Sequence, residues 1–305
     1  MKASAILTAD IEIRSFQPVC RTDNHWKAQE RKIKWLCDLQ KENDNCPIFD
    51  AGDLLDKKYK TNPSHELLNW AIHNLPYDIY TVPGNHDLPG KSIKNYKNSA
   101  MAVLEGAGVL TAVGTTFLDD FAIIGFPWGV PIKLSNRQSQ YINKKKKPII
   151  ALIHEMIYEN EPPFPGCEGF SAEQVIDMLP GVDLIVTGHH HQTFTLKKGK
   201  QILVNPGSLM RNDADQVDFK PSVFLWYAEN NSIKRVFVPI EEGVISREHI
   251  EVVKQREERL DAFIEKLGDQ TVTGVNFHEN LERAVSSKEV AQPVKDKVWQ
   301  YYEGI

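Results

Sequence analysis

The sequence predicts an α/β protein, and three observations lead to this fold class. Short apolar runs rich in branched side chains alternate with longer amphipathic segments as far as about residue 190, which is the pattern of strands separated by helices. Each of these runs ends in a cluster of polar residues. After residue 190 the runs follow one another closely, as in antiparallel hairpins. A helix-flanked sheet that ends in hairpins accounts for all three observations.

The apolar runs and the amphipathic segments give the expected order of elements up to residue 190. The runs predict strands at Ser4–Ala9, Pro47–Ala51, Asp78–Val82, Phe121–Phe126, Pro148–Ile153 and Asp183–Thr187. The amphipathic segments predict helices at Trp26–Lys41, Pro63–Asn74 and Ser171–Leu179. Ser64 stands where the second of these helices needs its N-cap, and Glu66 in the first turn complements the helix dipole.

The remaining elements suggest a large domain followed by a small one. Closely spaced strands are expected at Thr193–Leu196, Gln201–Val204, Ser222–Tyr227 and Ser232–Val238. From about Ile245 the composition becomes charged and helical, and one apolar stripe is formed by Leu260, Phe263, Ile264 and Leu267. We therefore expect a domain over residues 1–240 and a C-terminal helical segment over residues 241–305, which would cap the domain or bind a partner.

Composition and charge exclude several classes of protein. Of 305 residues, 41% are apolar and 25% charged, which is ordinary globular composition. The formal net charge of −5 argues against a protein that coats nucleic acid by bulk electrostatics, so any contact with DNA must be local. The four cysteines form no metal-binding pattern, and we find neither a signal peptide nor an apolar run long enough to span a membrane. We expect a cytoplasmic protein with free thiols.

Acids, amides and imidazoles follow the ends of the predicted strands. They occur at Asp10, Gly52-Asp53, Gly84-Asn85-His86-Asp87, His154 and Gly188-His189-His190-His191. Taken singly, each has a plainer explanation: an Asp after a strand often makes a turn, and a lone His on an apolar strand is often a core residue. Ligands of open α/β sheets bind outside the carboxyl ends of the strands, so features in this order would converge on one crevice. The series as a whole therefore predicts a metal site.

This series of motifs closely resembles the calcineurin-like metallophosphoesterases over residues 4 to 240. Within that superfamily the chain is most similar to SbcD-type DNA repair nucleases, including short phage-encoded relatives. The narrower likeness depends on Leu7-Thr8-Ala9-Asp10, on Gly52-Asp53-Leu54-Leu55-Asp56, on the Pro18–Asp23 insertion and on Asn205-Pro206-Gly207-Ser208-Leu209-Met210-Arg211. The resemblance implies a sandwich of two sheets flanked by helices, with a small C-terminal helical appendage.

The resemblance also implies two divalent metal ions and assigns their ligands. Asp53 would bridge the metals, Asp10, Glu12 and His191 would complete one site, and Asn85, His154 and His189 would complete the other. This mixture of oxygen and nitrogen donors suits manganese first, with iron, zinc or magnesium as alternatives. His86 would face the phosphate and help the leaving oxygen depart, while Asp87 would fix the His86 ring or merely cap a turn.

One residue departs from the family pattern. The first motif is normally Asp-x-His, whereas this chain has Asp10-Ile11-Glu12. Glu12 shares a strand-end face with Asp10 under two-residue alternation, so it is expected to bind metal through oxygen. The same change also permits a degraded first site. His190 would point away from the metals between its two neighbours.

Three functions remain open at this level. The leading hypothesis is a manganese-dependent DNA exonuclease or endonuclease that acts in repair or recombination by metal-activated water attack, in a bacterial cell or encoded by a phage. Its partners would be DNA, an SbcC-like ATPase subunit and, in a homodimer, a second copy of the chain. The alternatives are a phosphodiesterase for small substrates and a non-catalytic assembly subunit.

Overall fold

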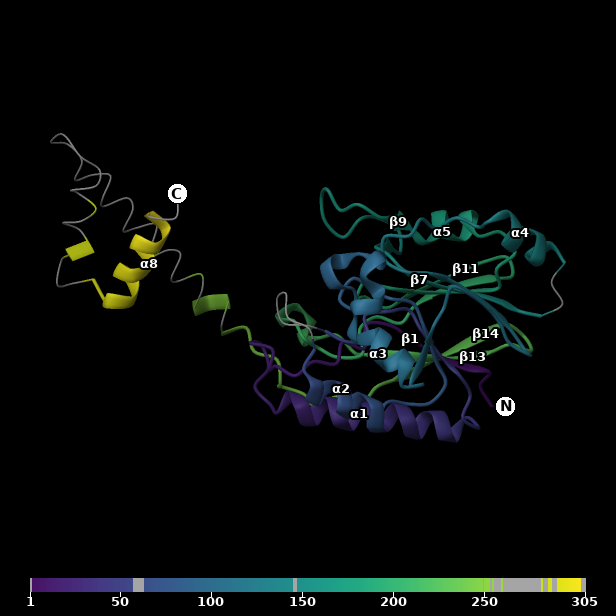
Figure 1. Cartoon of the computed structure of the whole chain (residues 1–305), viewed down its shortest axis with the longest axis horizontal. Helices are drawn as coiled ribbons and strands as arrows, with labels where there is room; N and C mark the ends of the chain where they lie inside the picture. Colours follow the sequence, from purple (N-terminus) through teal and green to yellow (C-terminus); the bar gives the residue numbers. More distant parts are fainter. Residues whose placement is uncertain are drawn as a thin grey trace. The chain divides into compact units, whose positions relative to one another are not determined.

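The protein is described from a computed structural model (Figure 1). The structure describes residues 2–56, 63–144 and 147–248, and beyond them residues 250–252, 254, 259, 281, 285, 286 and 290–302. The chain divides into two compact units, residues 1–246 and 247–305. The first unit extends to Ser246, past the boundary at residue 240 that the sequence suggests, and it holds every candidate site residue.

The first sheet of the larger unit has six strands in the order β14-β13-β1-β2-β3-β4. They are β1 (Ala5–Thr8), β2 (Ile48–Asp50), β3 (Ile79–Thr81), β4 (Leu110–Ala112), β13 (Ser222–Tyr227) and β14 (Ser232–Phe237). The strands β1 to β4 are parallel, whereas β13 pairs antiparallel with β1 and with β14. The carboxyl ends of β1, β2 and β3 therefore meet at one edge.

The second sheet also has six strands, in the order β11-β12-β10-β7-β6-β5. They are β5 (Thr115–Phe117), β6 (Ala122–Phe126), β7 (Ile149–His154), β10 (Leu184–Gly188), β11 (Phe194–Lys198) and β12 (Gln201–Asn205). The four inner strands are parallel, and both edge strands are antiparallel to their neighbours. The short strands β8 (Ile157–Tyr158) and β9 (Phe170–Ser171) form a separate pair.

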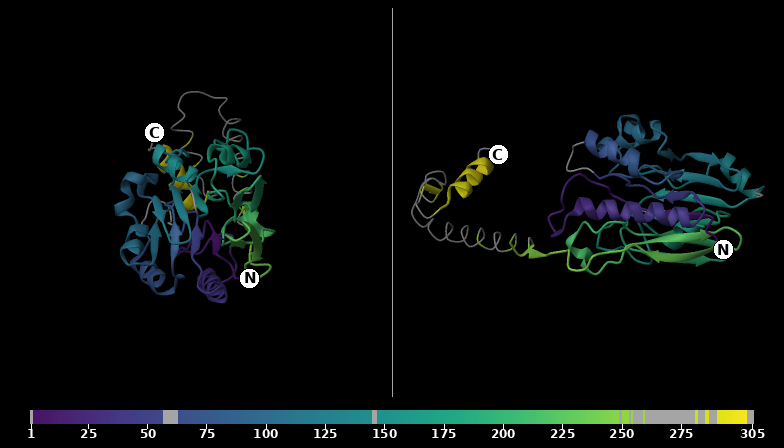
Figure 2. Two further views of the ribbon diagram at one scale, coloured as in Figure 1. Left: turned by 90° about the vertical axis from the view of Figure 1, so that its right-hand side faces the viewer. Right: turned by 90° about the horizontal axis from the view of Figure 1, so that it is seen from below.

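Helices cover the outer face of each sheet (Figure 1). The first sheet packs against α1 (His25–Glu42), α2 (His65–Asn74) and α3 (Ala100–Gly106), and the second against α4 (Asn136–Asn143) and α5 (Ala172–Met178). Three 3-10 helices lie in the connections: η1 (Pro89–Lys91), η2 (Ile93–Asn98) and η3 (Ala214–Val217). Seen from below, α1 lies in front of the sheet that it covers (Figure 2).

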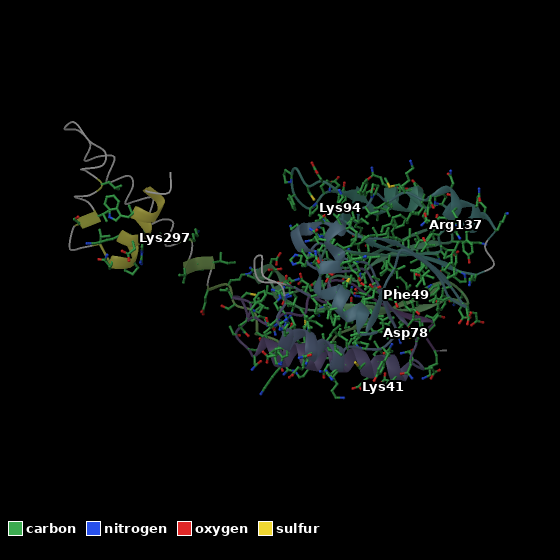
Figure 3. The ribbon with its side chains drawn as sticks, in the orientation of Figure 1. Lys41, Phe49, Asp78, Lys94, Arg137 and Lys297 are labelled. Carbon is green, nitrogen blue, oxygen red and sulfur yellow. The ribbon has the colours of Figure 1, made fainter. Side chains whose placement is uncertain are left out.

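Alternating side chains along each strand fill three layers of core. On β1, Ile6 packs among the helices while Leu7 packs between the two sheets. Phe49 and Trp226 are fully buried in that middle layer, where Figure 3 labels Phe49. The predicted α/β fold, with two sheets flanked by helices, is confirmed.

The sequence analysis found the buried strands and the long helices but overlooked exposed or short elements. Ser64 caps α2 as predicted, with its side chain accepting a hydrogen bond from the backbone of Leu67. The edge strands β4 and β5 were not predicted, because each has three residues and β5 is largely exposed, which leaves no apolar run to detect. The short helices α3 and α4 were overlooked as well.

The smaller unit contains α8 (Gln292–Tyr302). The predicted apolar stripe of Leu260, Phe263, Ile264 and Leu267 lies outside the described residues. Among the described residues no helix has the length and hydropathy needed to cross a membrane. All four cysteines, Cys20, Cys37, Cys46 and Cys167, are free thiols.

Candidate metal centre

Hydrogen bonds between the two sheets bring the polar strand ends together. Asp10 follows β1, Asp53 follows β2, and His189 follows β10. The backbone N–H of His189 donates to both carboxylate oxygens of Asp10, at 3.0 and 3.1 Å. His154, the last residue of β7, places its Nδ1 2.7 Å from the carbonyl oxygen of Ala51, the residue that follows β2. Residues from four strand ends thus surround one small volume.

A first group of donors consists of Asp53, Asn85, His154 and His189. Ligand atoms of Asp53, His154 and His189 all lie within 4.8 Å of one another. Nε2 of His154 is 3.2 Å from Oδ2 of Asp53 and 3.1 Å from Oδ1 of Asn85. Because Nδ1 of His154 is held by a backbone carbonyl, its Nε2 is the nitrogen that faces the group, as is usual for a metal-binding histidine.

A second group of donors consists of Asp10, Glu12 and His191. Nε2 of His191 lies 3.9 Å from Oδ1 of Asp10 and 3.6 Å from Oε1 of Glu12. Both carboxylates are buried. The structure therefore brings Glu12 to the same histidine as Asp10, although both residues lie beyond the end of β1 and outside the extended conformation on which the two-residue alternation depends.

Four of these donors hold unusual backbone conformations. The φ angles of Asp10, Glu12, Asp53 and His189 are 47°, 50°, 54° and 82°. Positive φ is uncommon for residues other than glycine, and residues held there cluster at functional sites. The surrounding hydrogen bonds thus impose a conformation at the centre that local preference does not favour.

Two glycines let the backbone come close to the donors. A Cβ on Gly84 would stand 2.1 Å from Oδ1 of Asp53, and one on Gly52 would stand 2.6 Å from Nδ1 of His154. Gly52 also has a φ of +94°. Any side chain at these two positions would push the donors apart.

His86 is held by Asp56, not by Asp87. Nδ1 of His86 lies 2.5 Å from Oδ1 of Asp56, and the His86 backbone N–H donates to Oδ1 of Asp53 at 2.7 Å. Asp56 belongs to the second sequence motif, in which no role was predicted for it. Its position three residues after Asp53 was the available signal.

The predicted role of Asp87 in fixing the His86 ring is wrong. The buried Asp87 carboxylate accepts hydrogen bonds from the backbone N–H groups of Asp53 and Gly84, each at 2.9 Å, and of Leu55 at 3.2 Å. These bonds tie the loop after β2 to the loop after β3. The alternative of a turn cap is therefore nearer to what the structure shows.

Asp53 and His154 shift each other's pKa in opposite directions. Burial alone would raise the pKa of Asp53, but the charge and hydrogen bond of His154 outweigh it and lower the pKa to about 2. Burial would lower the pKa of His154, but Asp53 and Asp10 raise it to about 10. Without a metal the two groups therefore form an ion pair.

Burial and neighbouring charges also shift the pKa values of the other groups in the centre. Burial raises the pKa of Asp10 to about 7, and burial together with the Asp53 charge raises that of Asp87 to about 8. Burial and the neighbouring His154 lower the pKa of His189 to about 3, which leaves a neutral imidazole. Crowded carboxylates and neutral imidazole are the donors that divalent transition metals bind, so the residues present fit such ions.

Glu12 has polar neighbours that the sequence analysis did not predict. Oε2 of Glu12 accepts hydrogen bonds from Nη2 of Arg14 at 3.1 Å and from Nδ2 of Asn212 at 2.8 Å. The same Arg14 nitrogen is 2.7 Å from Oδ2 of Asp56. Arg14 stands two residues after Glu12, but a single sequence gives no sign of this contact.

The loop Asn205-Pro206-Gly207-Ser208 and the following Leu209 make backbone hydrogen bonds with the second donor group. The backbone N–H of Ser208 donates to the carbonyl of His191 at 3.3 Å, and that of Leu209 donates to the carbonyl of Asp10 at 3.1 Å. His190 lies beside Phe194, with ring centroids 6.1 Å apart, and belongs to neither donor group. The loop therefore positions the second group of donors through the backbone.

A cavity of about 450 Å³ adjoins this network. Arg14 lines it together with the aromatic side chains Phe16 and Trp26. The guanidinium carbon of Arg14 lies 5.0 Å from the centre of the Phe16 ring. The cavity thus offers apolar surface next to the residue that contacts Glu12 and Asp56.

Solved structures with some likeness to this chain include phosphoesterases and nucleotidases, and no curated protein matches it. A candidate 5′-nucleotidase of Staphylococcus aureus is 12% identical with a TM-score of 0.49, covering 83% of this chain, which spans 58% of that protein. The calcineurin-like phosphoesterase YfkN of Bacillus subtilis is 14% identical with a TM-score of 0.46, covering 84% and 96% of the two chains. A 5′-nucleotidase precursor of Thermus thermophilus is 16% identical with a TM-score of 0.43, covering 85% and 59%.

All three TM-scores lie below 0.5, so the family assignment depends on the match to a family model. The model of the calcineurin-like phosphoesterases matches residues 16–193. This range contains Asp53, Asn85, His86, His154 and both His189 and His191, whereas Asp10 and Glu12 precede it. The match extends over more than half of the chain, and on this ground the chain belongs to the calcineurin-like phosphoesterase family.

Proposed function

We propose that the chain is a phosphodiesterase with two divalent metal ions, and that its substrate is DNA. The observation that carries the proposal is the meeting of two donor groups beside His86, each with at least one buried carboxylate and one histidine. Members of the family hydrolyse phosphoesters with metal ions, and this arrangement provides ligands for two.

The two donor groups would divide the metals between them. Asn85, His154 and His189 would hold one ion, Asp10, Glu12 and His191 would hold the other, and Asp53 would serve both. When bound, two divalent cations place positive charge at the phosphoryl oxygens and make water more acidic. The share of oxygen donors favours Mn²⁺ over Zn²⁺.

The proton for the leaving oxygen would come from His86. The hydrogen bond with Asp56 raises the pKa of His86 to about 9, so the ring is protonated near neutral pH. Asp56 holds Nδ1, which leaves Nε2 as the nitrogen available to a substrate. About a third of the His86 side chain, 38%, is exposed, whereas Asp56 is buried. His86 can therefore reach a bound phosphodiester while its ring orientation stays fixed.

One observation supports DNA as the substrate, and a second concerns how the DNA would be held. The strand-end motifs and the segment Asn205–Arg211 resemble SbcD-type nucleases, and the structure places that segment behind the second donor group. The net charge of −5 suits a subunit that acquires DNA affinity from a partner, here an SbcC-like ATPase or a second copy of the chain in the cytoplasm.

A second candidate is a phosphodiesterase that acts on a small nucleotide. The cavity beside Arg14 has about 450 Å³, which lies in the usual range for small-molecule sites, and its aromatic walls suit a base. The non-catalytic alternative has less support, because Glu12 keeps a buried carboxylate oxygen beside His191.

A nuclease assay with the full chain tests the proposal. End-labelled single- and double-stranded DNA and a chromogenic phosphodiester are incubated with Mn²⁺, Mg²⁺ or Zn²⁺, with chelator and with the His86→Ala variant as controls. Cleavage of DNA that requires metal and His86 supports the nuclease. Cleavage of the chromogenic ester alone would favour the small substrate, and inactivity on both with two bound metals would contradict the proposed enzyme.

A further inference from the structure

One nitrogen of Arg14 joins the second donor group to the pair of His86 and Asp56. Nη2 of Arg14 lies 3.1 Å from Oε2 of Glu12 and 2.7 Å from Oδ2 of Asp56. The other oxygen of Asp56 contacts His86 at 2.5 Å. The side chains of Arg14, Glu12 and Asp56 are 10%, 4% and 6% exposed, so water screens these charges little.

The two carboxylate oxygens of Glu12 have different partners. Oε2 is occupied by Arg14 and by Asn212. Oε1 faces Nε2 of His191 at 3.6 Å. A carboxylate fixed in this way presents one oxygen to a cation, as an imidazole presents one nitrogen. The positive charge of Arg14 also balances the extra negative charge that a carboxylate brings to a position where the family has histidine.

The backbone of Arg14 is held as firmly as its side chain. Gln29 on α1 accepts a hydrogen bond from the Arg14 N–H at 2.8 Å and donates one to the Arg14 carbonyl at 2.9 Å. Gln29 is 1% exposed. These two hydrogen bonds restrict the movement of Arg14, so it holds Glu12 and Asp56 in fixed positions.

We infer that Arg14 is a positioning residue, which holds Glu12 so that one oxygen stays beside His191, where it would bind a metal, and holds Asp56 so that His86 keeps its orientation. The inference rests on the proposed function for its kinetic consequences, and it explains why Glu12 is compatible with an intact site. Arg14 touches no donor other than Glu12 among the hydrogen bonds and ion pairs of the described residues.

The experiment compares Arg14→Gln with Arg21→Gln in the full chain. Arg21 is a matched control, because its side chain is 4% exposed, it pairs with Asp23 at 2.6 Å and bonds the carbonyl of Arg211, and it makes no hydrogen bond or ion pair with a donor among those of the described residues. Melting temperatures are measured with Mn²⁺ and with chelator, and the rates of chromogenic phosphodiester hydrolysis are fitted for kcat and KM.

Arg14→Gln should lower the melting temperature of the metal-free protein by roughly 5–15 °C, because it leaves buried carboxylates without their cation. It should lower that of the Mn²⁺ form less, since the metal then neutralises Glu12. Arg21→Gln should lower both forms equally. We expect kcat of Arg14→Gln to fall by about 10- to 100-fold, the usual effect of losing a residue that orients a metal site, with little change in KM.

Arg14→Lys provides the rescue, and it remains informative if Arg14→Gln does not fold. A single nitrogen makes both contacts, so a lysine ammonium should retain kcat within about threefold even though it lacks the guanidinium fork. Equal stability losses with and without Mn²⁺, or a kcat of Arg14→Lys as low as that of Arg14→Gln, would overturn the inference while leaving the proposed function intact. A wild-type protein that binds no Mn²⁺ would overturn both.

Discussion

His86 and Asp56 meet at the border between the buried donors and solvent. Asp56 is buried and His86 is partly exposed, and their 2.5 Å contact is the largest cause of the raised His86 pKa. A histidine whose pKa is about 9 keeps its proton through the neutral range and loses it only in mildly alkaline solution. The pair therefore sets the pH above which proton donation should fail.

We predict that Asp56→Asn shifts the alkaline limb of the kcat–pH profile to lower pH. The charged form of His86 loses the carboxylate charge that favours it and keeps at most a weaker bond to a neutral amide, so its pKa falls toward the ordinary value of about 6.5 and activity declines earlier as pH rises. A profile measured from about pH 5 to 10 checks this, with His86→Ala as the reference for lost proton donation, about 10² to 10⁴ in rate. An unshifted limb would remove His86 from proton transfer.

A second prediction concerns the proton on His154. In the metal-free protein the pKa of His154 is about 10, so Nε2 carries a proton where the first donor group would hold a cation. Metal binding must displace this proton, and Mn²⁺ affinity should therefore rise with pH by up to about tenfold per unit until the pKa is passed. Titration calorimetry in two buffers of different ionisation enthalpy counts the protons released. Asp53→Asn should release fewer protons and abolish activity, and binding without proton release would contradict the assignment.

The candidate metal-binding side chains could be predicted from the sequence, whereas the residues that position them could not. Asp10, Asp53, His154 and His189 follow apolar runs, so their positions at strand ends could be predicted from the pattern alone. Arg14 and Asn212 make contacts that depend on how distant loops fold, with 200 residues separating Asn212 from Glu12. No periodicity in a single sequence encodes such a contact.

Helix α1 has a stripe of buried polar side chains that contact the segments around the metal centre. Gln29 binds the backbone of Arg14, and Nζ of Lys32 donates to the carbonyl of Leu209 at 2.7 Å. Burial and the nearby Arg21 lower the pKa of Lys32 to about 7. His25 on the same face is 1% exposed. The stripe connects the helix to the segment that carries Glu12 and to the loop behind His191.

We predict that Gln29→Leu destabilises the protein by roughly 2–4 kcal/mol, because both buried backbone groups of Arg14 lose their partner. The melting temperature should drop by about 10 °C, and kcat should fall with it as Arg14 becomes mobile. Lys34→Ala on the exposed face of α1 is the control and should change neither value. An unaltered melting temperature in Gln29→Leu would show that water replaces the lost contacts.

Amphipathic periodicity predicted α1 within a residue at each end, because its apolar positions Ile33 and Leu36 repeat at helical spacing. The same periodicity gave no reason to expect buried glutamine and lysine beside them. The strands β4 and β5 were overlooked for the opposite reason, since exposed edge strands need few apolar residues.

The end of the larger unit is attached to the loop that follows Arg14. Ile245 forms a bridge with Arg21, and the backbone N–H of Ser246 donates to the Cys20 carbonyl at 2.7 Å. Val244 and Ile245 are buried. Because residues up to Ser246 make these contacts, a shortened chain should end after Ser246.

We predict that a chain of residues 1–246 keeps its melting temperature and its hydrolysis of small phosphodiesters. A chain of residues 1–240 should melt roughly 10 °C lower, because it loses two buried aliphatic side chains and their backbone bonds. If the C-terminal segment mediates association, light scattering should give fewer copies per particle for residues 1–246 than for the full chain. The same number of copies in both would contradict a role in association.

The left-handed backbone conformation also affects which substitutions would stabilise the chain. It occurs at Asp10, Glu12, Asp53 and His189. Residues other than glycine cost on the order of 1–2 kcal/mol in this conformation, and Asp, Asn and His are the ones that tolerate it best. Glu12 has φ 50° without belonging to that set. Replacing Glu12 with Gly or Asn would relieve this strain but would leave the buried Arg14 without one of its carboxylate partners. A chain that no longer needs the cations would therefore gain stability only by changing positions 12 and 14 together.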